Sequence, residues 1–285
     1  EFTLKGRLRG TLDTYTIFAN AILNPGVDLY YMGSDIGDVS DKREIISRLD
    51  IKNNEIKVRN IQYQKYILSQ NKKETPYEML KVSGGIKGGD KGLYLDNLKI
   101  VTPNPAPARL LNIFFKKSIL KHGTFVSNML LNGTIAEPKV NGNLKFSNIA
   151  VPLYDSQIKG IDLTFDNRLI HAVFEGTGMG SDVKLAAEII NKATLPVVIN
   201  KAEITSKTIN LNDFISGLSR FSKANKSTDP TAKQEMLLSP VDFEIKSGKF
   251  SAKEIYYNNV KAQNFQGNFK HTKDGVFAFN DVMFD

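Results

Sequence analysis

The sequence predicts a mainly β protein whose strands have one apolar and one polar face, with two short helices between them. Apolar and polar residues alternate in many short segments; in one of them Val241, Phe243 and Ile245 alternate with charged residues. The alternation returns at 140–146 and 183–189, and a period of two places all the apolar side chains of a strand on one face. A hydrophobic content of 41% and a mean hydropathy of −0.25 suit sheets with one face in water.

Turn-forming residues separate the strands expected in the first part of the chain. Asn24-Pro25-Gly26 is a strong turn signal, and Asn53-Asn54 is typical of a hairpin turn that tolerates positive φ. Glycines at 84–85 and 88–89 are expected to divide a further stretch into two short strands. The strands are therefore expected within residues 3–12, 14–31, 43–67 and 82–100.

Two segments break the alternation and predict helices near 108–121 and 211–222. Pro107 suits the first turn of the earlier helix, and Gly123 suits its C-terminal stop. This helix would either lie on a membrane surface or close an open end of the sheet, and we favour the second interpretation. Residues 222–236 are rich in Lys, Ser, Thr and Asp, which is typical of a mobile loop.

Beyond residue 123 the alternation resumes. The most regular piece, 131–149, predicts two strands joined at Glu137-Pro138. Aromatic residues fall mostly in phase with the aliphatic ones, whereas basic residues take the opposite face. This favours a sandwich core or the wall of an apolar groove over a nucleic-acid-binding sheet, which displays both on one face. Further strands are expected at 161–165, 169–174 and 183–189, and from 241 to the end.

Motifs that would carry catalysis or bind a metal are absent from the sequence. The chain has no cysteine, and His122, His171 and His271 lack metal-ligand spacing. The glycine-rich stretch 176–181 lacks the Lys-Ser/Thr ending of a phosphate loop and precedes a strand-like segment. The sequence therefore predicts no enzymatic activity, no metal and no cofactor.

The net charge of +8 would attract lipid headgroups, lipopolysaccharide or nucleic acid. Because no run reaches five basic residues, we favour a charge scattered over wet strand faces and expect no nucleic-acid partner. Both ends are strand-like, so we expect an internal or C-terminal piece of a longer protein, or a mature form without its anchor. The sequence predicts one elongated β segment, 1–285, and a possible sub-division into 1–122 and 123–285.

Two segments resemble a known family, at 131–190 and 237–284. The first carries the pattern Leu131-x-Gly133-x-Ile135-x-x-Pro138-x-Val140-x-Gly142-x-Leu144-x-Phe146-x-Asn148. The second carries Pro240-Val241-Asp242-Phe243-x-Ile245-x-Ser247-Gly248-x-Phe250, followed by Phe265-x-Gly267-x-Phe269. These patterns resemble the AsmA-like family of Gram-negative envelope proteins, which belongs to the bridge-like lipid-transfer proteins with repeating β-groove modules.

The resemblance implies an elongated, twisted antiparallel sheet curled into an open β-groove, apolar inside and wet outside. It further implies a periplasmic protein, anchored to the inner membrane outside this chain, that moves phospholipid or another acyl-chain lipid to the outer membrane. The family offers no catalytic residues. The groove lining is expected to include Val140, Leu144, Phe146, Leu163, Phe165, Val241, Phe243, Ile245, Phe265 and Phe269.

A non-enzymatic scaffold for outer-membrane biogenesis is the alternative function. Such a β-rich module would dock an outer-membrane protein partner through its sheet edges.

Overall fold

The computed structural model describes most of the chain. The described residues are 2–27, 30–31, 34–35, 40–68, 74–89, 92–114, 120, 122–135, 137–151, 156–178, 180–191, 197–213, 243–272 and 276–285. They form two compact units, here called unit 1 (Glu1–Ser118 and Thr124–Lys145) and unit 2 (Ile119–Gly123 and Phe146–Asp285).

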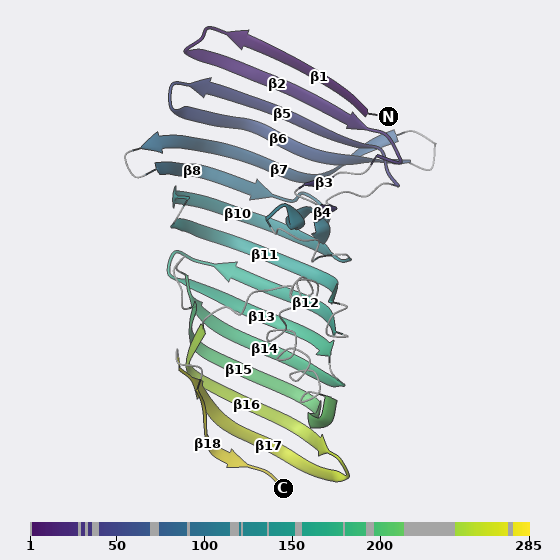
Figure 1. Ribbon diagram of the computed structural model, residues 1–285, viewed down its shortest axis with the longest axis vertical. Helices are drawn as coiled ribbons and strands as arrows, with labels where there is room; N and C mark the ends of the chain where they lie inside the picture. Colours follow the sequence, from purple (N-terminus) through teal and green to yellow (C-terminus); the bar gives the residue numbers. More distant parts are fainter. Residues whose placement is uncertain are drawn as a thin grey trace, which may run out of the picture. The chain divides into compact units, whose positions relative to one another are not determined.

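Unit 1 consists almost entirely of strands that pair with their neighbours in the chain (Figure 1). Its main strands are β1 (Phe2–Gly10), β2 (Thr14–Leu23), β5 (Arg43–Lys52), β6 (Glu55–Leu68), β7 (Glu74–Gly89), β8 (Gly92–Val101), β10 (Thr124–Thr134) and the start of β11 (Pro138–Val151). The short strands β3 (Tyr30–Tyr31) and β4 (Ser34–Asp35) pair with each other, and β9 (Ala106–Pro107) pairs with β10.

Unit 2 continues the same construction. Its strands are the end of β11, β12 (Ser156–Phe165), β13 (Leu169–Gly178), β14 (Ser181–Ile190), β15 (Val197–Asn210), β16 (Phe243–Tyr257), β17 (Val260–His271) and β18 (Phe277–Met283). The hydrogen-bonded order of the large sheet, β9 apart, follows the chain order from β1 to β18, and these two strands are its free edges. The predicted class is therefore confirmed: the protein is mainly β, with one open sheet.

One strand pair departs from the expected antiparallel arrangement. β15 and β16 are parallel, with Val197 opposite Phe243 and Asn210 opposite Tyr256. Parallel neighbours need a connection of a dozen or more residues, and residues 211–242 provide it. The sequence indicated this long insertion, but strand direction depends on where the chain returns.

The predicted turns are mostly confirmed, and one predicted break is wrong. Asn53 has a φ of 48° between β5 and β6, and the amide of Val27 donates to the Asn24 carbonyl after β2. In contrast, β7 runs straight through Gly84 and Gly85. Gly84 has a φ of +136°, and a Cβ there would lie 2.4 Å from the Asn97 carbonyl oxygen, so the glycine permits a register shift within a continuous strand.

The first predicted helix needs correction, and the second is described only at its start. In the described part of the range predicted for the first helix, residues Ala108–Phe114 form a 3₁₀ helix, η1, and not an α-helix. Ala108 is fully buried directly after β9 pairs with β10, so tight packing of the first turn sets the local backbone. Of the helix predicted at 211–222, residues 211–213 are helical. The remainder, and the loop predicted at 222–236, lie outside the described residues.

Candidate functional site

The strand register of unit 2 builds one continuous apolar face. Side chains that alternate along each strand are aligned across strands by the pairing. We call this surface the unit 2 apolar face. One row across it is Leu163, Ala172, Ala187, Ala202, Gly248, Phe269 and Phe279; a second is Phe165, Ile170, Ile189, Ile199, Ile245 and His271; a third is Ile161, Phe174, Leu185, Ile204, Phe250 and Gly267.

The centre of this face is its most buried part. Ala202, Ile245 and Phe269 form a cluster with at most 8% of each residue exposed. Around them pack partly buried neighbours, namely Leu185, Ile199, Ile204, Phe243 and Phe250. These neighbours keep part of their surface accessible, so solvent reaches the margin of the cluster.

Aromatic rings concentrate at the C-terminal end of the unit 2 apolar face. The ring centroid of Phe250 lies 5.2 Å from that of Phe265, 6.3 Å from Phe269 and 5.9 Å from Phe279. Phe279 is 57% exposed, so the cluster extends from the buried centre to solvent. Such rings provide a large apolar contact area.

The predicted lining residues are distributed over both units. Phe146, Leu163, Phe165, Phe243, Ile245, Phe265 and Phe269 belong to unit 2, all at least half-buried. Val140 and Leu144 belong to unit 1, where they are half-buried on β11. Val241 lies outside the described residues. A role of these residues in binding lipid stays a prediction.

Sequence reasoning missed the contribution of β15 to this face. Ala202 and Ile204 stand at its centre, yet no strand was predicted at 197–210. The signal was present, because Ala202, Ile204 and Ser206 alternate with Lys201, Glu203 and Thr205. Phe250 was recognised as a strand aromatic but not as a lining residue.

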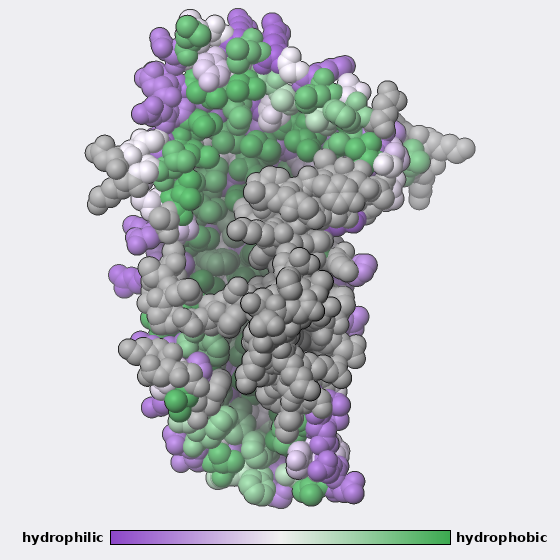
Figure 2. All heavy atoms as spheres, viewed as in Figure 1, coloured by the Kyte–Doolittle hydropathy of each residue, from purple (hydrophilic) through white to green (hydrophobic). Residues whose placement is uncertain are grey.

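Unit 1 has its own apolar face. The register aligns apolar residues of β2, β5, β6 and β7, for example Ile17 with Leu49, Leu49 with Val58 and Ile45 with Tyr63. Figure 2 shows hydrophobic side chains gathered on this part of the viewed surface. On edge strand β1 the face is open to solvent, since Leu4 is 66% and Leu8 68% exposed.

The opposite face of unit 1 carries a ladder of polar side chains across three strands. The carboxylate of Glu44 on β5 accepts hydrogen bonds from Asn20 on β2 and from Gln64 and Tyr66 on β6. Burial opposes ionisation of Glu44, but the hydrogen bonds from Tyr66, Asn20 and Gln64 outweigh it and hold the pKa of Glu44 below its ordinary value. The ladder links strands and presents no nucleophile.

The histidines do not form a chemical site. His271 is buried at the end of β17, stacks on Phe243 with ring centroids 4.2 Å apart, and lies 2.9 Å from the Phe243 carbonyl through Nδ1. His171 is exposed on the opposite face. Among the residues that the structure describes, no group of histidine and carboxylate side chains is arranged to hold a metal ion.

Comparison with known proteins gives no match: no family model fits the chain, and neither a curated protein nor a solved structure is similar to it. In the described part of the chain, no helix has the length and apolar character to cross a bilayer.

Proposed function

We propose that this chain is an AsmA-like periplasmic protein that takes part in phospholipid transport between the inner and outer membranes, with acyl chains bound on its apolar sheet face. The observation that carries the proposal is the row from Leu163 to Phe279, which crosses seven strands of unit 2 with apolar or glycine residues at every step.

The physical chemistry of that face suits a lipid tail. Burying an acyl chain yields about 0.8 kcal/mol per CH₂ group. Contacts with Leu, Ile and Phe side chains are non-directional, so a tail would slide along the face without meeting one dominant binding site. The polar face of the same strands would stay in water, with exposed residues such as Asp162, Thr164 and Lys246.

A scaffold is the second candidate, and edge strand β1 favours it. All nine of its residues are exposed, and Leu4 and Leu8 extend the apolar face of unit 1 to the edge. An exposed strand edge is a template for pairing with a strand of another protein. An outer-membrane protein would be the expected partner.

Native mass spectrometry of the protein purified from a bacterial host separates the two functions. Transport predicts a mass increment of one or more phospholipids, confirmed by extraction and lipid analysis. A lipid-free mass, together with a protein that is captured by wild type but not by a chain with proline substitutions in β1, would favour the scaffold and contradict the transport proposal.

A further inference from the structure

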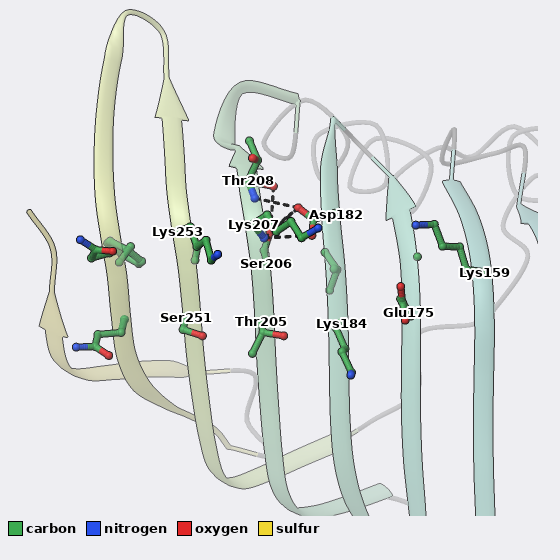
Figure 3. A pocket seen from close by; sticks show the side chains of 16 residues that line it. Lys159, Glu175, Asp182, Lys184, Thr205, Ser206, Lys207, Thr208, Ser251 and Lys253 are labelled. Carbon is green, nitrogen blue, oxygen red and sulfur yellow. Dashed lines mark hydrogen bonds between the residues drawn. The ribbon is translucent and has the colours of Figure 1, made fainter.

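The polar face of unit 2 contains an open hollow of about 810 Å³ that spans β12 to β17 (Figure 3). Its middle is formed by short polar side chains, including Thr205 and Ser251, which pair across β15 and β16. Four lysines surround them: Lys159, Lys184, Lys207 and Lys253. This volume falls in the usual range of small-molecule sites, about 300–1,000 Å³.

None of the four lysines has a carboxylate partner within ion-pair distance in the described part of the chain. Other lysines of the protein do: Lys65 pairs with Asp41 at 2.8 Å, and Lys261 pairs with Glu254 at 2.7 Å. The ammonium groups around the hollow are therefore available to an external anion.

The two carboxylates of the hollow do not neutralise it. Asp182 accepts hydrogen bonds from the backbone amides of Lys207 and Thr208 and from the Ser206 hydroxyl. Burial opposes its ionisation, but these hydrogen bonds outweigh burial and hold the pKa of Asp182 below its ordinary value. The negative charge of Asp182 is thus already hydrogen-bonded to β15. Four lysines against the two carboxylates of Asp182 and Glu175 leave the hollow with two excess positive charges.

Two of the lysines stand on adjacent strands. Lys207 and Lys253 stand between the paired positions Ser206–Ala252 and Thr208–Glu254 of adjacent strands, so they lie side by side. An anionic group bound between the two strands could therefore form charge-assisted hydrogen bonds with both lysines. Lys159 and Lys253 point toward one another across the strands between them (Figure 3).

The lysines are too far apart for one anionic group of a ligand to contact all of them. Four interstrand steps separate β12 from β16, which is about 19 Å between the strands of Lys159 and Lys253 at ~4.8 Å per step. A single phosphate does not reach both ends of such a hollow. Between the lysines, Thr205, Ser251 and Gln266 offer hydrogen bonds to hydroxyl groups.

We propose that this hollow binds a hydroxyl-rich ligand that carries two or more phosphate groups, with Lys159 and Lys184 at one side and Lys207 and Lys253 at the other. The ligand is either a free sugar bisphosphate or the phosphorylated sugar headgroup of a lipid. The lysines of β14 to β16, Thr205 and Ser251 alternate with the residues of the apolar face, and Val183 and Phe265 of that face also border the hollow. The proposal rests on the lysines and therefore does not depend on the proposed transport function.

Calorimetric titration at low salt tests the proposal with fructose 1,6-bisphosphate, and with glucose 6-phosphate as the single-phosphate probe. The source is distinguished by flotation with phosphatidylcholine vesicles, with and without phosphatidylinositol 4,5-bisphosphate. Saturable binding of the sugar bisphosphate indicates a free ligand, and binding only to the phosphoinositide vesicles indicates a headgroup. Glucose 6-phosphate is expected to bind at least tenfold more weakly than the bisphosphate, because one set of lysines stays unpaired.

A matched pair of double variants supplies the control. Lys207→Gln with Lys253→Gln should weaken binding at least tenfold. Lys201→Gln with Lys246→Gln removes two exposed lysines of the same two strands outside the hollow and should change binding less than twofold. Circular dichroism confirms that both fold. The proposal is overturned if neither fructose 1,6-bisphosphate nor the phosphoinositide vesicles bind, if the two double variants behave alike, or if a 20-base-pair DNA duplex binds more tightly than both of these ligands.

Discussion

Phe269 and Gly248 show how tightly single residues are matched on the unit 2 apolar face. Phe269 is only 4% exposed, and a Cβ placed on Gly248 would lie 2.4 Å from its ring. The glycine thus gives the ring its place over the neighbouring strand, an arrangement in which an aromatic side chain compensates for the missing side chain of glycine.

Replacing Gly248 should therefore destabilise the protein. Gly248→Ala forces the buried ring of Phe269 to move, and we expect a loss of about 1–3 kcal/mol in the free energy of unfolding. Urea denaturation measures the loss. Gly160→Ala is the control, because its Cβ would meet nothing nearer than the Phe146 carbonyl at 3.7 Å. Equal effects at the two positions would contradict this account of the packing.

Leu163 allows a residue-level test of the proposed lipid surface. Leu163→Glu places a carboxylate in the apolar row, whereas Thr164→Glu places the same group on the exposed face one residue later. Leu163 is a cleaner position than Phe243, because Phe243 stacks on the His271 ring and its replacement would also remove that contact. Unpaired burial of the new charge is costly, although the open face admits water beside it.

The expected result is that Leu163→Glu folds but retains less than half of the co-purified phospholipid, while Thr164→Glu retains the wild-type amount. Lipid phosphorus per mole of protein and thermal melting are the measurements. A folded Leu163→Glu protein with undiminished lipid would remove this face from the transport proposal.

At the scale of elements, strands are joined by side chains as well as by their backbones. The polar ladder of Asn20, Glu44, Gln64 and Tyr66 fixes β2, β5 and β6 to one another. Because these bonds favour the charged form, the pKa of Glu44 is lower in the folded state than in the unfolded chain. The unfolded state therefore binds more protons as the pH falls, and acid weakens the ladder.

We expect Glu44→Gln to reduce the pH dependence of stability. The contribution of Glu44 is fully present above the ordinary carboxylate pKa of about 4.3 and is lost as the pH falls through its lower folded-state pKa. Urea denaturation at several values between about pH 6 and pH 3 should give a shallower slope for the variant than for wild type. Glu137→Gln, at an exposed turn, serves as the control. An unchanged slope in Glu44→Gln would show that the ladder does not contribute.

At the scale of the whole molecule, each unit has an apolar face and a polar face, and the net charge of +8 is distributed over the polar residues. A ligand that binds the apolar face of the folded protein, and does not bind the unfolded chain, stabilises the folded state by mass action. The proposed function therefore has a thermodynamic consequence that needs no knowledge of the natural lipid.

Delipidated protein should gain thermal stability when monomeric lysophosphatidylcholine is added. At a concentration one hundred times the dissociation constant, the expected stabilisation is about 2.7 kcal/mol. Differential scanning calorimetry measures the rise in Tm with lipid concentration. Glycerophosphocholine, which has the headgroup without an acyl chain, should have no effect; equal shifts with both compounds would count against acyl-chain binding.

The local pattern of the sequence was sufficient for the fold class and for much of the candidate site. Alternation predicted the strands that carry Leu163, Phe165, Phe243, Ile245 and Phe269, because the side-chain direction in a strand depends only on the parity of the position. Turn residues such as Asn53 could be predicted equally well, because the tolerance of positive φ belongs to the residue type. The segment that became β15 was missed although it carried the same signal.

Other features depended on which strands meet, and only the tertiary structure decided them. The parallel pairing of β15 with β16 brings Lys207 beside Lys253, residues 46 positions apart whose adjacency no local pattern contains. Register shifts within β7 and β16 likewise arise from contacts between strands. The local sequence of a strand decides which face each of its side chains takes, whereas the pairing of distant segments decides which side chains become neighbours. The apolar faces could therefore be predicted from the sequence, and the lysine hollow is seen only in the tertiary structure.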